Sequence, residues 1–143
     1  MKYDNSKLQP WIQFTRFFES ISCITRLSAH HFKNDADLNK RLRDFYVSII
    51  DIDNAFTRTC YEIRNGKDIN VNLDDFNIPT LNTDSLNNVE ELKKLFSETI
   101  TETEEPLTYI LNDVPENADD KFNYLKEPIK NFLSSVKEVN ILL

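Results

Sequence analysis

The sequence predicts an all-α protein, an elongated four-helix bundle, and three observations support this. Residues 38–63 keep an apolar side chain at steps of four and three, the spacing of a helix packed along its whole length. One glycine and five prolines are few for a chain with many tight turns. Apolar residues at the same spacing recur in 10–32, 85–113 and 117–143. At 143 residues we expect a single domain, 1–143.

The first predicted helix covers residues 10–32. Pro10 fits a first turn, where its missing N–H leaves no acceptor unpaired. Seven large apolar residues project to one side at 100° per residue: Trp11, Phe14, Phe17, Phe18, Ile21, Ile24 and Phe32. The heaviest part of the core is therefore expected here.

The second predicted helix covers residues 36–64. Asn34, Asp35 or Asp37 can cap its start, and Asn65-Gly66 supplies a left-handed residue at its end. Its core side is formed by Leu38, Leu42, Phe45, Ile49, Ile52, Phe56, Cys60 and Ile63. The opposite side mixes apolar and basic residues: Arg43, Val47, Ile50, Asn54, Arg58 and Tyr61. Packing on two sides and a docking face for another protein both explain this mixture.

Residues 67–84 are predicted to be a long connecting loop. Ile69, Val71 and Leu73 alternate with polar residues, and we expect them to hold the loop against the bundle. The third helix is predicted to cover residues 85–113, with Asn88 as a capping residue and with a break or kink at Pro106.

The fourth predicted helix covers residues 117–143 with a kink at Pro128. Its apolar residues keep their spacing across that proline: Phe122, Leu125, Ile129, Phe132, Val136 and Val139. One kinked helix in register is therefore expected, not two unrelated ones.

The net charge of −7 is concentrated in the second half of the chain. Residues 1–66 hold ten Lys or Arg against eight Asp or Glu, whereas residues 67–143 hold seven against sixteen. Eight carboxylates and no Lys or Arg lie between Glu98 and Asp120. Such a surface repels nucleic acid and anionic lipid and suits a basic protein partner. No apolar run reaches the roughly 18 residues of a membrane span, and we expect a cytoplasmic, or in a eukaryote nuclear, protein.

Metal and cofactor chemistry is not indicated. The two histidines, His30 and His31, have no acid three residues before them, so the Glu-x-x-His pairs of di-metal bundles are missing. One glycine cannot form a glycine-rich phosphate loop. No cofactor is expected.

Two short motifs resemble enzyme families. Arg26-Leu27-Ser28-Ala29-His30-His31 resembles the Arg and His motif of HEPN ribonucleases. That resemblance implies that Arg26 stabilises charge on a phosphodiester while His31 transfers a proton. The competing interpretation, which we favour, is a basic cluster at a helix C-terminus.

The second motif is a pair of acidic clusters, Glu102-x-x-Glu105 and Glu116-x-x-Asp119. It resembles the motifs with which MazG-type nucleotide pyrophosphatases hold Mg²⁺. A solvated acidic helix face explains the same residues, and we favour it.

By elimination, the sequence favours a non-catalytic protein–protein interaction module: a subunit, an adaptor, or an acidic inhibitor that covers a basic site. The expected contact residues are Arg43, Val47, Ile50, Asn54, Arg58, Tyr61, Glu98, Glu102 and Glu105. The alternative is a HEPN-like ribonuclease that uses Arg26 and His31. Homo-oligomerisation is left open.

Overall fold

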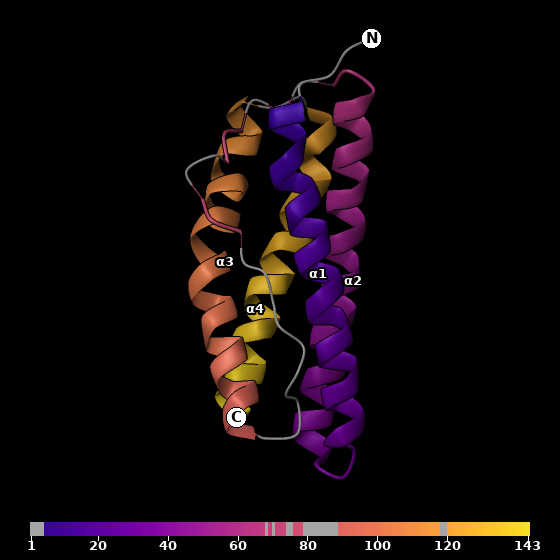
Figure 1. Ribbon diagram of the computed structural model, residues 1–143, viewed down its shortest axis with the longest axis vertical. Coiled ribbons are helices and arrows are strands. Elements are labelled where there is room, and N and C mark those ends of the chain that lie inside the picture. The colour runs from indigo at the N-terminus through magenta and orange to yellow at the C-terminus, as the bar shows by residue number, and fades with distance from the viewer. Residues whose placement is uncertain (1–4, 68, 70, 74–75, 79–88, 118–119) are drawn as a thin grey trace.

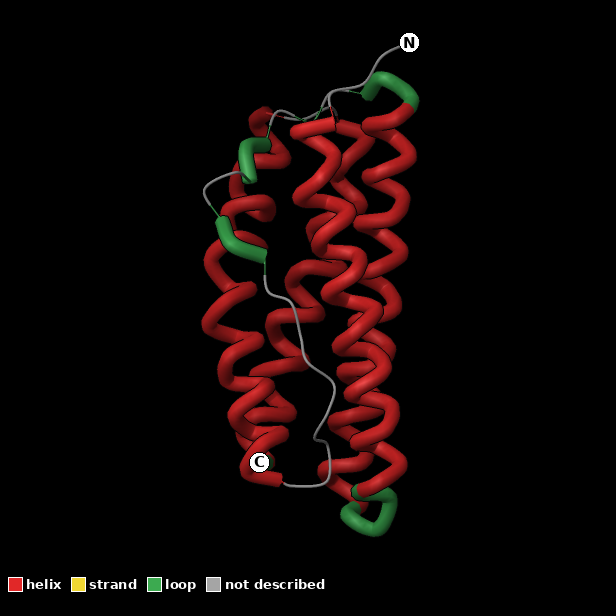
Figure 2. Tube along the Cα trace, viewed as in Figure 1, coloured by secondary structure: helices red, strands yellow, loops and turns green. Residues whose placement is uncertain are grey.

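The chain forms a bundle of four long α-helices (Figure 1), which confirms the predicted fold class. The computed structural model describes residues 5–67, 69, 71–73, 76–78, 89–117 and 120–143. The elements are α1 (Asn5–His31), α2 (Ala36–Arg64), α3 (Val89–Asn117), the short 3₁₀ helix η1 (Asp120–Leu125) and α4 (Lys126–Leu142). Figure 2 shows that helices make up almost all of the described chain.

The helices form two antiparallel pairs, α1 with α2 and α3 with α4 (Figure 1). The pairs meet where α2 packs against α4. Figure 1 shows α2 and α3 running in the same direction, so residues 65–88 connect opposite ends of the bundle. Loop length alone could not fix this topology, because the connection is long enough for either direction.

A chain of aromatic contacts links all four helices through the core. Three rings of α1 surround Phe56 of α2, with centroid distances of 5.0 Å for Trp11, 5.2 Å for Phe14 and 5.1 Å for Phe18. The remaining contacts are Phe18 with Phe132 at 5.4 Å, Phe132 with Phe45 at 5.5 Å and Phe45 with Phe96 at 5.5 Å. These rings join α1 and α2 to α4, and α2 to α3.

Helix α2 begins and ends where the sequence predicts. The Asp35 side chain accepts a hydrogen bond from the Leu38 backbone N–H at 3.2 Å. At the other end Gly66 has φ of 86°, and its N–H donates to the Ile63 carbonyl. Lys67 N–H donates to the Glu62 carbonyl, which completes a Schellman motif. Both ends are set by local backbone chemistry.

Helix α1 begins five residues earlier than predicted, at Asn5, so Pro10 lies inside the helix and not in its first turn. The extra turn places Leu8 in the core, where it is 1% exposed. Burial of a leucine is worth roughly 2 kcal/mol, which offsets much of the cost of an internal proline.

Helix α3 continues through Pro106 and through Pro115 to Asn117, so it does not end at Pro106 as one form of the prediction had it. A kink at Pro106 stays a prediction. Pro106 is buried beside Leu107 and one turn from Ile110. Packing of this face therefore compensates for the hydrogen bond that Pro106 cannot donate to Glu102. The predicted cap Asn88 lies outside the described residues.

The predicted fourth helix is two helices of different type. The 3₁₀ helix η1 ends at Leu125, and α4 begins at Lys126. Pro128 is thus the third residue of α4, in the first turn, where a backbone N–H has no partner within the helix. The predicted apolar register is confirmed, since all six residues from Phe122 to Val139 that define it are buried.

Three residues of the connection, Ile69, Val71 and Leu73, are buried in the same core as the helices, as predicted. Further along, Phe76 is partly buried and its ring lies 5.3 Å from that of Tyr109 on α3. The described part of the connection therefore contributes side chains to the bundle.

Candidate interaction surfaces

The predicted glutamates form a continuous row on the outer surface of α3. Glu98, Glu102 and Glu105, which we call the acidic row, are all exposed and follow one another at steps of four and three. Residues at these steps are neighbours on a helix, with Cβ atoms about 5–6 Å apart. Tyr109, four residues beyond Glu105, continues the row.

An aromatic pair closes one end of the acidic row. Phe76 and Tyr109 border an open depression of about 700 Å³. Its lining residues are Phe76, Ile100, Thr101, Glu104, Glu105, Thr108, Tyr109 and Asn112. Sequence reasoning missed this depression because its aromatic residues come from distant segments.

The acidic row is largely uncompensated. In the row itself, Glu98 lies 4.0 Å from Lys94. Lys137 pairs at 2.8 Å with Glu104, which is not part of the row. Within the described chain no cation lies within ion-pair distance of Glu102 or Glu105. The last turn of α3 also lacks a basic residue, so α3 itself supplies no cation to offset the negative end of its helix dipole.

A second exposed surface runs along α2, away from its core side. Val47 and Tyr61 are 58% and 60% exposed, and Arg43, Asn54 and Arg58 are also exposed. We call these five residues the outer row of α2. Ile50, predicted to belong to this surface, is only partly exposed. Helix α2 does pack on two sides, against α1 and α4, but through other residues.

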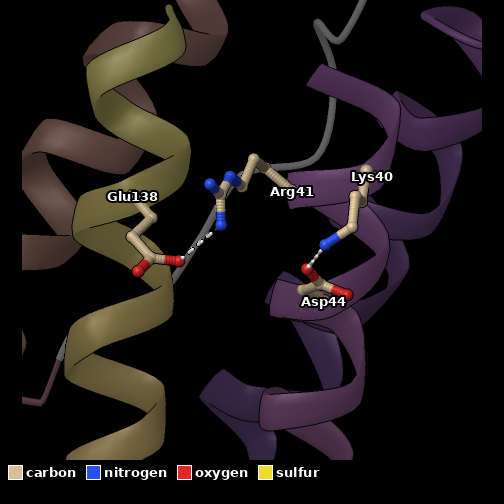
Figure 3. A network of polar contacts seen from close by, with 4 residues as sticks. All are labelled: Lys40, Arg41, Asp44 and Glu138. Carbon is tan, nitrogen blue, oxygen red and sulfur yellow. Dashed lines mark hydrogen bonds and ion pairs between the residues drawn. The ribbon is translucent and has the colours of Figure 1, made fainter. Parts of the chain in front are cut away.

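The basic residues of α2 differ in whether they have an acidic partner. Lys40 pairs with Asp44 and Arg41 with Glu138 of α4, both at 3.1 Å (Figure 3). Among the described residues, Arg43 and Arg58 have no such carboxylate partner. Arg64, at the C-terminal end of α2, has none among the described residues either, so two of the three uncompensated basic residues of α2, Arg43 and Arg58, lie on its outer row.

Arg58 and Thr59 tie α2 to η1. The Arg58 guanidinium lies 4.1 Å from the centre of the Tyr124 ring, and the Tyr124 hydroxyl lies 2.7 Å from Thr59 Oγ1. Burial raises the pKa of the Tyr124 hydroxyl, which keeps it protonated as a hydrogen-bonding group. Beside this contact is a depression of about 390 Å³, lined by Asp51, Asn54, Ala55, Arg58, Tyr124, Glu127, Pro128 and Asn131.

One titratable residue that sequence reasoning missed is Asp53, between α1 and α2. Its Oδ1 is buried without a hydrogen-bond partner in the described structure. Burial, and secondarily the negative charge of Glu19, raises the pKa of the Asp53 carboxyl from 3.8 to about 6. Asp53 lies four residues after Ile49 and seven before Cys60, which is the helical spacing of the core side. That spacing was the sequence signal that could have indicated a buried carboxyl.

The residues of the HEPN-like motif do not converge. Arg26 and His31 are both exposed near the end of α1, and five residues on a helix correspond to a rotation of about 140°. The His31 ring instead meets Phe32 edge-on at 4.7 Å. Within one copy of the chain these side chains point in different directions.

The structure describes only part of the paired acidic motif. Glu102 and Glu105 are exposed on α3, and Asp119 lies outside the described residues. Across the described part of the chain, no group of three or more His, Cys, Asp and Glu side chains could hold a metal ion. Their exposure makes Glu102 and Glu105 part of a charged surface of α3.

Comparison with models of protein families, with curated proteins and with solved structures gives no match for this chain. In the described residues, no helix has both the length and the apolar character needed to cross a membrane. Surface chemistry is therefore what distinguishes the candidate functions.

Proposed function

We propose that this protein is a non-catalytic binding module that recognises a basic segment of a larger protein, as a subunit, adaptor or inhibitor. The observation that carries the proposal is the acidic row of α3 ending at the aromatic pair Phe76 and Tyr109. A segment with Lys or Arg beside an apolar residue would match both the acidic row and the aromatic pair.

The charges of the acidic row act together. Neighbouring glutamates of the row have Cβ atoms about 5–6 Å apart, which is less than the Debye length of about 8 Å at physiological salt. Their fields therefore add, which speeds encounter with a basic partner and disfavours acidic ones.

The row also carries a cost to the free protein. Like charges at steps of three and four destabilise a helix by about 0.2–0.5 kcal/mol per pair. Glu102 and Glu105 lack compensating cations in the described chain, so this repulsion persists until a basic partner binds. Residues that break a local stability rule often serve a function.

The aromatic pair gives the surface a place for a side chain to bind. Tyr109 is partly buried against Phe76, with an interplanar angle of 47°. A lysine or arginine over such a ring gains about 0.5–1 kcal/mol at an exposed site. Apolar stems of these side chains can contact Ile100, which lines the same depression.

The test is binding of a fluorescently labelled Lys- and Leu-containing peptide, measured by anisotropy. We expect Glu98→Gln, Glu102→Gln and Glu105→Gln together to weaken binding by roughly tenfold to a hundredfold, since each lost charge contributes about 0.5–1 kcal/mol. Tyr109→Ala should weaken peptide binding further, because the tyrosine ring that would contact a lysine side chain of the peptide is then missing.

The matched control is Asp37→Asn, Asp51→Asn and Glu127→Gln, which changes the net charge equally and leaves α3 intact. We expect it to bind nearly as the wild type does. Equal weakening by both triple variants would show that net charge alone attracts the peptide, and the proposed site would be wrong.

A further inference from the structure

We propose that the outer row of α2 is a self-association surface, on which two copies of this chain pair with antiparallel α2 helices around a twofold axis beside Asn54. All five residues of the row are exposed, although Arg58 also contacts Tyr124 of η1, and the row extends for about 27 Å along α2, from Arg43 to Tyr61. A twofold contact requires a surface that is complementary to itself.

The apolar residues of the outer row meet this requirement. Val47 and Tyr61 each lie seven residues from Asn54, about 10.5 Å along the axis in opposite directions. In an antiparallel pair centred on Asn54, Val47 of each copy is therefore level with Tyr61 of the other copy. Both are more than half exposed, so the pairing removes their apolar surface from water.

The charges of Arg58, within the row, and of Asp51, beside it, match in the same way. Asp51 lies three residues before Asn54 and Arg58 four residues after it, about 4.5 and 6 Å along the axis. Both line the depression on the α4 side of the row. A twofold axis brings the same side of each helix together, so Asp51 of one copy faces Arg58 of the second, twice per dimer.

A second copy is a better occupant than an unrelated helix of one charge. An acidic helix would meet Asp51 and Glu127 beside Arg58, and a basic one would meet Arg43 and Arg58. Only an occupant with alternating charge in the opposite direction satisfies Asp51 and Arg58 together, and the antiparallel copy has that order. Because one helix pair is a small interface, the dimer should be weak and concentration dependent.

This surface is separate from the proposed peptide site. Helix α3 packs against α4, which in turn packs against α2, so the acidic row lies on a different helix from the outer row of α2 (Figure 1). Dimerisation through α2 leaves both acidic rows accessible. Failure of either proposal therefore leaves the other standing.

The test is sedimentation velocity of the full chain between about 1 µM and about 1 mM. We expect the wild type to shift from monomer towards dimer across this range. Asp51→Arg and Arg58→Glu should each weaken self-association at least about tenfold, because like charges then face each other twice per dimer. Circular dichroism verifies that both variants stay helical.

Mixing the two variants provides the decisive measurement. In a mixed dimer one chain carries Asp51→Arg and the other Arg58→Glu, and both contacts again join opposite charges. We expect the equimolar mixture to dimerise about as strongly as the wild type. The controls are Asp37→Arg and Lys130→Glu, which change exposed charges away from the row. Each control variant should dimerise by itself as strongly as the wild type does.

A wild type that remains monomeric up to about 1 mM would overturn the proposal. So would single variants that dimerise as the wild type does, or a mixture that stays monomeric like its components. Restoration on mixing identifies both the surface and the antiparallel register.

Discussion

At the scale of single residues, Asp53 contributes a pH-dependent term to stability. Its carboxyl has a pKa of about 6 in the folded chain, above the ordinary 3.8, because burial and Glu19 disfavour its charge. The folded state therefore binds the proton more tightly than the unfolded state does. The contribution of Asp53 is most favourable below about pH 4 and is lost as the pH rises through 6.

Asp53→Asn should accordingly stabilise the protein near pH 7.5 and leave it almost unchanged near pH 4. The gain should be about 1 kcal/mol in the free energy of unfolding, well below the full value of the shift because the side chain is only half-buried. Urea denaturation at both pH values measures it. Asp51→Asn, which removes an exposed charge from the same helix, is the control. A variant no more stable than the wild type near pH 7.5 would contradict this account.

At the scale of elements, polar contacts hold the 3₁₀ helix η1 against α2. The Thr59 hydroxyl lies 2.9 Å from the Ala55 carbonyl and 2.7 Å from the Tyr124 hydroxyl. When Thr59 donates to Ala55, the Tyr124 hydroxyl donates to Thr59. This contact helps to explain why residues 120–125 form a separate element where one continuous helix was predicted.

Tyr124→Phe should lower the free energy of unfolding by about 1 kcal/mol, the usual value of one hydrogen bond. The ring stays in place, so the contact with Arg58 is kept. Tyr61→Phe removes a hydroxyl from an exposed tyrosine of α2 and should change stability by less than about 0.5 kcal/mol. Thermal unfolding followed by circular dichroism distinguishes the two. Equal effects would mean that the Thr59 contact adds no stability.

At the scale of the whole molecule, the aromatic contacts join the two antiparallel pairs. Phe132 of α4 touches Phe18 of α1 and Phe45 of α2, and Phe45 also touches Phe96 of α3. Phe132 is thus shared by both pairs and is completely buried. Cooperative unfolding should depend on it.

Phe132→Ala should cost about 3–5 kcal/mol, since it removes a buried ring and leaves a cavity. The exposed Lys130→Ala on the same helix should stay within about 0.5 kcal/mol of the wild type. Urea denaturation followed by both tryptophan fluorescence and circular dichroism tests this. Trp11 reports on the α1–α2 pair, so two separated transitions would indicate that the pairs have lost their coupling.

The surfaces were partly predictable from the sequence. Helical spacing identified the acidic row and all five residues of the outer row of α2, because an exposed position on a helix follows from the core position opposite it. Partial burial of Ile50 and the meeting of Phe76 with Tyr109 depend on neighbours far away in the chain. Spacing within one segment carries no information about such neighbours.

The sequence by itself determined the helical class, the core register and both ends of α2. Asp35, Gly66 and the apolar steps of four and three act within one or two turns, so their effect does not depend on the rest of the fold. Tertiary structure alone decided that α3 continues through Pro106, that η1 separates from α4, and that Asp53 is half-buried. Each of these depends on which faces pack together, and long-range packing can outweigh local preference by several kcal/mol.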